Sequence, residues 1–234
     1  GYGNSPANAD SSLTNLVSNT GVVATDTSGV GTARLALAGC EYGDDTGIFG
    51  FGNTSGPTNR VAITNLVSNT GVVATDTSGV GTARRNVAAC EYGGDKGIFG
   101  YGHDSGSPVS MTNLISNTGV ASTDVTGVGT ARGYGAACGY GDDKGIFGYG
   151  YVGGDLGMTN LVSNTGVVST DVTGVGTARR SLAATQYGGD KGIFGYGEAP
   201  LHSITNLVSN TGVIATDTDG VGTGRASLAA CSYN

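Results

Sequence analysis

The sequence is poor in charge and in long apolar runs. Only 12% of its 234 residues are charged, and 11 basic residues face 18 acidic ones, for a net charge of −7. No basic stripe runs along the chain, which argues against nucleic acid as a partner. No apolar run approaches the roughly 20 residues of a membrane-spanning helix, so we expect no insertion into a membrane.

Groups suited to catalysis or metal binding are also scarce. No candidate nucleophile stands beside a base. Neither histidine, His103 or His202, lies near a cysteine position of the repeat described below. The acidic turns at 44–45, 95, 142–143 and 190 offer fewer oxygens than the six to eight of a calcium site. We therefore expect no catalytic residue, no metal and no cofactor.

Targeting signals are missing as well. The sequence begins Gly-Tyr-Gly, with no initiator methionine and no signal peptide. This start is typical of a processed protein, a trimmed chain or a piece of a longer one. The sequence therefore leaves the compartment open.

What the sequence does contain is a repeat. Residues 64–84, TNLVSNTGVVATDTSGVGTAR, recur unchanged at 14–34 and with few changes at 112–132, 159–179 and 205–225. A second block, GIFG followed by an aromatic residue and glycine, starts at residues 47, 97, 145 and 192. Five units of about 47 residues have the period of propeller repeats. They fill the chain, so we predict a single domain spanning residues 1–234.

One unit, residues 84–132, predicts four short strands. Residues 86–92 alternate between two faces with the period of a strand. The segments 93–96 and 117–119 have the residues of tight turns. Three further strands are predicted at residues 98–101, 112–116 and 120–125. Four antiparallel strands without any helical period are typical of one propeller blade.

The second strand predicts how blades stack. Phe99 and Tyr101 are expected on one face, and Ile98 and Gly100 on the other. Aromatic rings of one blade would then fill the space left by the glycines of its neighbour. The Ala-Ala-Cys strand is the slimmest, so we expect it innermost.

The cysteines are predicted to be free. Cys40, Cys90, Cys138 and Cys231 stand at one position of four units, and Thr185 fills it in the other. Equivalent positions lie about a blade apart, whereas a disulfide needs Cα atoms within about 7 Å. Four buried thiols acting as small apolar side chains are expected.

The two ends of the sequence are complementary. The chain starts with the tail of a second strand, Gly1-Tyr2-Gly3, and ends with a lone first strand at 227–233. Pairing of the last strand with the N-terminal ones would complete a fifth blade and leave no free edge. The prediction is an all-β, five-bladed propeller with four strands per blade. An open solenoid and a fragment of a larger propeller are the alternatives.

Three motifs then carry a resemblance. Arg-x-x-Leu-Ala-Ala, Gly-Ile-Phe-Gly-Tyr-Gly and Thr-Asn-Leu-Val-Ser resemble Kelch-type β-propeller repeats. They are more similar still to the Kelch-like repeats of structural and tail proteins of tailed bacteriophages and related environmental sequences. The chain departs from ordinary Kelch proteins, since it has Tyr-Gly or Phe-Gly for the Gly-Gly pair and no tryptophan. The resemblance covers essentially the whole chain and implies a binding or structural module of a larger, virion-associated or extracellular assembly.

An aspartate and an arginine eight residues apart flank every crossover between units. The pairs are Asp26/Arg34, Asp76/Arg84, Asp124/Arg132, Asp171/Arg179 and Asp217/Arg225. A ring of such charges is one way to bind an anionic or sugar ligand. Structural ion pairs, or hydrogen bonds to crossover carbonyls, explain the fixed spacing better, because the planar guanidinium suits both. We therefore predict structural ion pairs.

The segments between strands two and three differ in every unit. They span residues 4–13, 53–63, 103–110, 151–158 and 198–204. Their candidate binding residues are Arg60, His103, Asp104, Tyr151, Asp155 and His202. Loops on a rigid scaffold often carry binding groups, although neutral drift explains the variation at least as well.

Two functions follow as hypotheses. The first is a non-catalytic module that recognises a partner, a protein or a glycan, through these variable segments. The alternative is a lectin with up to five similar glycan sites, whose avidity would come from repetition.

Overall fold

The computed structural model describes residues 1–4, 9–55 and 59–232. Its described residues form strands, turns and irregular segments and contain no helix, which confirms the all-β prediction. Parts of the variable segments 4–13 and 53–63, and Tyr233 of the predicted last strand, lie outside the described residues.

Five antiparallel sheets follow one another along the chain. The first has two strands and the other four have three strands each. The strands are β1 (Gly3–Asn4) and β2 (Asp10–Ser11); β3 (Ala38–Tyr42), β4 (Thr46–Gly50) and β5 (Thr64–Val67); β6 (Ala88–Tyr92), β7 (Lys96–Gly100) and β8 (Thr112–Ile115); β9 (Ala136–Tyr140), β10 (Lys144–Tyr151) and β11 (Asp155–Val162); and β12 (Ala183–Tyr187), β13 (Lys191–Gly195) and β14 (Thr205–Val208). Each sheet belongs to one repeat unit. The units are unit one (residues 1–34), unit two (35–84), unit three (85–132), unit four (133–179) and unit five (180–225).

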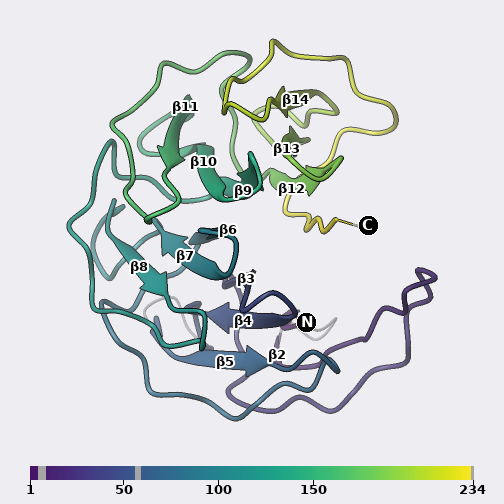
Figure 1. Ribbon diagram of the computed structural model, residues 1–234. Helices are drawn as coiled ribbons and strands as arrows, with labels where there is room; N and C mark the ends of the chain where they lie inside the picture. Colours follow the sequence, from purple (N-terminus) through teal and green to yellow (C-terminus); the bar gives the residue numbers. More distant parts are fainter. Residues whose placement is uncertain (5–8, 56–58, 233–234) are drawn as a thin grey trace.

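The sheets are arranged around a common centre (Figure 1). Within each three-stranded sheet the order is first, second, third strand, and β3, β6, β9 and β12 lie innermost. These are the Ala-Ala-Cys strands and their counterparts. Small side chains allow them to converge, as their sequence predicts.

The fourth predicted strand is an irregular outer segment in the described units. In unit three it bridges β8 only at Thr112↔Val125 and Ile115↔Ala121. Buried Asn113 points from β8 toward this segment, and its Nδ2 donates to Ser122 O and Asp124 Oδ1, each at 3.0 Å. This side-chain amide takes the place of ladder bonds. The prediction of four strands per unit is therefore corrected to three strands and a bridged segment.

Neighbouring units pack through a phenylalanine placed over a glycine. A Cβ on Gly50 would lie 2.8 Å from Cζ of Phe99 in the following unit, and Gly100 stands in the same relation to Phe147 at 2.7 Å. Phe194 covers Gly148 in the same way, and all three rings are at most 1% exposed. The predicted packing of rings on glycines is confirmed.

Tyr101 does not share the face of Phe99, contrary to the alternation read from the sequence. Its φ of 62° ends β7 and turns its ring toward unit four, where it lies 5.1 Å from the ring of Phe147. A bulky residue in the left-handed region is unfavourable unless its surroundings hold it there. Packing between two units supplies that restraint, so Phe99 contacts the preceding unit and Tyr101 the following one.

All four thiols are free, as predicted. Cys90 and Cys138 are buried, and burial raises the pKa of the Cys138 thiol to about 12. Each lies against a glycine of the following unit: a Cβ on Gly145 or Gly192 would be 2.6 Å from the sulfur. Cys231 is exposed, which corrects the prediction of four buried thiols. No described unit follows it to cover its side chain.

Unit one and unit five are not paired in the described residues. Residues 228–232 form no strand, and no β-bridge of the described chain joins them to unit one. Val17 and Val23 are 60% and 63% exposed, whereas Val162 and Val168 at the same positions of unit four are 0% and 9% exposed. The predicted pairing of 227–233 with the N-terminal strands is thus not observed.

Candidate functional site

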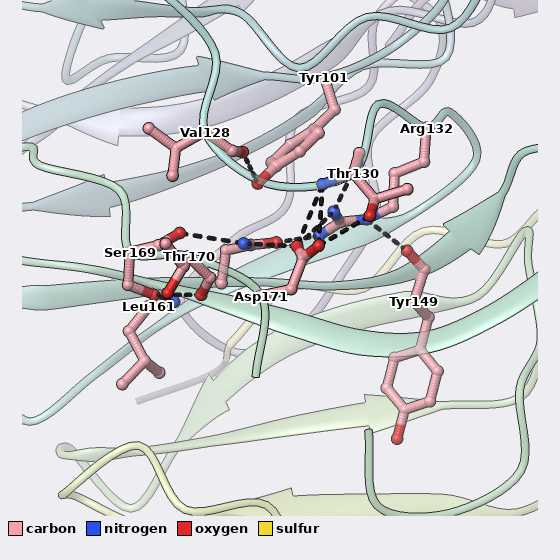
Figure 2. A network of polar contacts seen from close by, with 10 residues as sticks. Tyr101, Val128, Thr130, Arg132, Tyr149, Leu161, Ser169, Thr170 and Asp171 are labelled. Carbon is pink, nitrogen blue, oxygen red and sulfur yellow. Dashed lines mark hydrogen bonds and ion pairs between the residues drawn. The ribbon is translucent and has the colours of Figure 1, made fainter. Parts of the chain in front are cut away.

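Four crossover arginines, Arg34, Arg84, Arg132 and Arg179, each join two successive units. Arg132 lies over the ring of Tyr101, 4.0 Å from its centroid, at the end of unit three. Its Nε donates to Tyr149 O at 2.8 Å, and its Nη2 donates to Asn160 Oδ1 at 2.7 Å, both in unit four (Figure 2). The arginine is almost fully buried. It is therefore a buried side chain that connects two sheets, and not a surface charge.

An aspartate of the following unit completes this contact. We call the whole contact the latch: the arginine, the threonine two residues before it, and the asparagine and aspartate of the following unit. Asp171 accepts hydrogen bonds from the backbone N of Thr130 and from its Oγ1, the latter at 2.7 Å (Figure 2). It also accepts one from Asn160 Nδ2 at 2.9 Å. Partial burial alone would raise the pKa of Asp171, but the bonds from Thr130 and Asn160 lower it below its usual value. The latch thus holds an ionised carboxylate beside the buried guanidinium.

The ion pairs join different partners from those predicted. Arg34 pairs with Asp76 at 4.0 Å, Arg84 with Asp124 at 3.7 Å and Arg132 with Asp171 at 4.0 Å. No ion pair of the described residues links an arginine to the aspartate eight residues before it. The crossover carries each arginine into the next unit, while that aspartate stays in the outer segment of its own unit.

The same hydrogen bonds join units four and five, whereas Arg225 and Asp26 each carry only one half of the arrangement. Arg179 donates to Asn206 of unit five at 2.7 Å, and Asp217 accepts from Thr177. Arg225 stacks on Tyr196, 3.8 Å from the ring centroid. Asp26 accepts from Asn15 at 2.8 Å. Neither Arg225 nor Asp26 has an ion-pair partner among the described residues.

The acidic turns tie hairpins together. Asp95 accepts hydrogen bonds from Lys96 Nζ and from Asn117 Nδ2, the latter at 3.0 Å. Gly93 N donates to Asp143 O of the next unit at 2.7 Å. Among the described residues, no three histidine, cysteine, aspartate or glutamate side chains gather in a group that could hold a metal ion.

The variable segments meet at one end of the sheets, and we call this end the rim. They follow the second strands, near the crossover arginines, and in unit four β10 and β11 extend into the segment as a hairpin. Ser55 of unit two donates to Asp10 of unit one at 3.1 Å, so these segments contact one another from unit to unit. The rim is therefore a surface of changing composition on a uniform scaffold.

Three of the predicted candidates come together where units two and three meet. We call Arg60, Arg85 and His103, with Asp104 and Tyr134 beside them, the basic cluster. The His103 ring packs edge-on against Tyr134 at 5.3 Å. Burial, then the charges of Arg85 and Arg60, lower the pKa of His103. The pKa of Asp104 is lowered, first by hydrogen bonds from two backbone N–H groups and then by Arg60 and His103.

The basic cluster contains buried nitrogen atoms that lack partners. Arg60 Nε and Nη1, Arg85 Nε and His103 Nδ1 have no hydrogen-bond partner among the described residues. A buried polar atom left unpaired costs about 1–3 kcal/mol. Most native groups of this kind are satisfied by protein, water or ligand, so the cluster is chemically unusual.

Two other candidates lie where units four and five meet, in what we call the paired cluster. Arg180 donates from Nε to Glu198 Oε1 at 3.0 Å and from Nη1 to Asp155 Oδ1 at 3.2 Å. Its guanidinium lies 4.7 Å from the ring centroid of Tyr151. Ser181 Oγ also donates to Glu198, at 2.8 Å. The charged groups of Arg180, Asp155 and Glu198 are therefore paired with one another within the chain.

His202 stands apart from both clusters. Its backbone N donates to Gly197 O at 2.8 Å, and its O accepts from Arg225 N. Its Nε2 is buried with no hydrogen-bond partner among the described residues. No described contact brings this ring to the other candidates.

Arg85, Tyr134 and Arg180 are rim residues that the sequence reasoning missed. They lie in the segments that precede the first strands β6, β9 and β12, outside the variable segments. A signal was present: residues 35, 85, 133 and 180 occupy one repeat position and are Leu, Arg, Gly and Arg. A repeat position whose charge differs between units indicates that its side chain lies at the rim, where the composition also differs between units.

The innermost strands line an open cavity with a volume of about 610 Å³. Small side chains such as Ala89, Ala137 and Ala184 line it. Burial, and then the charge of Glu41, raise the pKa of Glu91, while a hydrogen bond with Gln186 opposes that rise. The cavity is therefore mostly apolar, with the carboxyl groups of Glu41 and Glu91 in its lining.

No protein family model matches the chain, and no curated protein matches its sequence. The likeness to Kelch-like phage repeats remains a prediction from the motifs. The described residues contain no helix that is long and apolar enough to cross a membrane.

Proposed function

We propose that the chain is a non-catalytic binding module of a larger assembly, and that it recognises a partner through the rim. The support is that residues shared by the units and residues that differ between units lie in different places. Arginine, aspartate, asparagine and threonine recur in the latches and hold the units together. Charged and aromatic residues that differ between units meet at the rim.

The observation that carries the proposal is the set of unpartnered nitrogen atoms in the basic cluster. Arginine offers only hydrogen-bond donors, and its planar fork matches carboxylate, phosphate and sulfate groups. The group recognised there therefore carries acceptor oxygens and negative charge. An acidic side chain of a protein and an anionic glycan both meet this description.

For the architecture of the module we infer a five-bladed ring. Unit five carries Thr223 and Arg225 at the positions of Thr130 and Arg132, and unit one carries Asp26 at the position of Asp171. Both halves of a fifth latch are thus present in the chain. Contact between units one and five would also cover Val17 and Val23, whose burial contributes about 1.5–3 kcal/mol each when complete.

A glycan array with sialylated, sulfated and neutral members tests the rim. The double variant Arg60→Gln, Arg85→Gln removes the unpartnered guanidinium donors and leaves His103 in place. Arg180→Gln is the matched control, because Arg180 is already paired with Asp155 and Glu198. We expect the double variant to lose anionic binding at least about tenfold and the control to stay within about twofold.

Equal binding by both variants would contradict the rim proposal. Titration calorimetry separates the lectin alternative. Five equal sugar sites would favour repeated sites on the uniform units, whereas one site lost in the double variant would favour the rim.

A further inference from the structure

The space over the glycine at the end of each second strand forms a socket for an aromatic ring. Phe99 fills it over Gly50, Phe147 over Gly100 and Phe194 over Gly148. Each ring comes from the Gly-Ile-Phe-Gly strand of the following unit. The same occupant therefore recurs at three successive boundaries.

The socket of unit five lacks this occupant. A Cβ on Gly195 would meet only Thr205 Cγ2 of its own unit, at 3.4 Å. A cavity of about 210 Å³ lies there, lined by Thr185, Ile193, Gly195 and Tyr196, among others. An apolar cavity of about 150 Å³ is enough to bind benzene. The space is therefore large enough for a phenyl ring.

Unit one does not supply the missing ring. Gly1-Tyr2-Gly3 stand at the positions of Gly50-Phe51-Gly52, and no described residue of unit one lies within 4 Å of a Cβ built on Gly195. The ring of Tyr2 lies 5.3 Å from that of Phe49, so it faces unit two.

A backbone edge accompanies this socket. Leu228, Ala229 and Ala230 line the same cavity. Residues 228–232 make no backbone hydrogen bond among the described residues. The counterpart segment in unit three, β6, pairs with β7 at Ala88↔Gly100 and Cys90↔Ile98. An open edge beside a side-chain pocket is the arrangement by which domains bind an added strand.

We propose that unit five binds an extended partner segment of the Gly-Ile-Phe-Gly pattern. Its phenylalanine occupies the space over Gly195, and its backbone pairs with residues 228–232. The glycines flanking the phenylalanine allow the close approach that Gly97 and Gly100 allow in unit three. This site is independent of the rim and of its anionic ligand.

A labelled peptide with the sequence of residues 93–102, Gly-Gly-Asp-Lys-Gly-Ile-Phe-Gly-Tyr-Gly, tests the proposal by fluorescence anisotropy with the intact chain. We expect saturable one-to-one binding. A peptide carrying Phe99→Ala should bind at least about tenfold more weakly, because the ring provides most of the buried apolar area.

Two variants of the chain complete the test. Gly195→Val fills the socket and should abolish peptide binding. Gly154→Val is the matched control, since a Cβ on Gly154 meets no atom within 4 Å. It should bind as the unmodified chain does, and circular dichroism checks that both variants fold.

Three results would overturn the proposal. They are equal binding of the two peptides, unchanged binding by Gly195→Val, and no binding by the folded chain at about 1 mM peptide. The last result would mean that the chain covers the socket with its own residues.

Discussion

The crossover arginine shows how one side chain can define a repeat. Arg84 lies over the ring of Phe51, donates to Tyr101 O and Asn113 Oδ1, and pairs with Asp124. Burial lowers its pKa to about 10, so it stays charged at neutral pH. A lysine could not make the same set of contacts, because it lacks the planar fork.

Arg84→Lys is therefore expected to destabilise the chain by about 2–4 kcal/mol, since buried Asn113 Oδ1 loses its donor. Urea denaturation monitored by circular dichroism measures this. Arg85→Lys is the matched control at the next position, where the side chain makes no hydrogen bond with described residues through Nε. The control should change stability by less than about 0.5 kcal/mol. Equal losses in the two variants would contradict the assigned role of Arg84.

The latch aspartates predict sensitivity to acid. Partial burial would raise the pKa of Asp124, but hydrogen bonds from Thr82 and Asn113 lower it below its usual value of 3.8. The unfolded carboxyl group has the higher pKa, so this group stabilises the folded chain above about pH 4. That stability is lost as the pH falls through the folded-state pKa. We expect the melting temperature to drop steeply below about pH 4, and Asp124→Asn to flatten the drop.

At the scale of strands, packing between units depends on which glycine has a neighbour. Gly100→Ala would place its Cβ 2.7 Å from the ring of Phe147, and we expect a loss of about 1–3 kcal/mol. Gly195→Ala is the matched variant with an open face. It should be neutral or stabilising by up to about 1 kcal/mol, because it restricts the unfolded chain. Thermal denaturation compares the two, and equal destabilisation would refute the open socket.

The thiols report on the same boundaries. Cys90 and Cys138 are buried between units, and burial raises the pKa of the Cys90 thiol well above its usual value. Cys231 is exposed. A thiol-specific reagent should therefore modify Cys231 rapidly and the other two only on unfolding. Comparable native rates for Cys90 and Cys231 would contradict the packing described for the inner strands.

The strands themselves could be read from the sequence, because alternation and turn glycines act locally. The side of Tyr101 could not, since its φ of 62° is held by Phe147 of another unit. The irregular outer segment could not be predicted either, because its conformation also depends on contacts between residues that are not adjacent in the sequence. Asn113 looks like an ordinary strand residue in the sequence, and only the fold reveals its bonds to Ser122 and Asp124.

For the whole molecule, the repeat predicted one domain of sheets around a centre but assigned the ion pairs to the wrong partners. Spacing along the chain placed Asp124 with Arg132, whereas the structure pairs Asp124 with Arg84. Arg34, Arg84 and Arg132 each meet an aspartate one unit further on, so pairing is a property of neighbouring units. The candidate site was predicted in part. Arg60 and His103 meet as variable residues, while Arg85 joins them from the segment that precedes β6.

This pairing rule makes closure of the ring testable. If units one and five meet in solution, Asp26 forms an ion pair with Arg225, as Asp124 does with Arg84. Asp26→Asn and Asp124→Asn are compared in urea denaturation. A closed ring predicts similar losses of about 1–3 kcal/mol, because each variant leaves an arginine without its carboxylate. A loss for Asp124→Asn together with a change below about 0.5 kcal/mol for Asp26→Asn would show that the ring stays open.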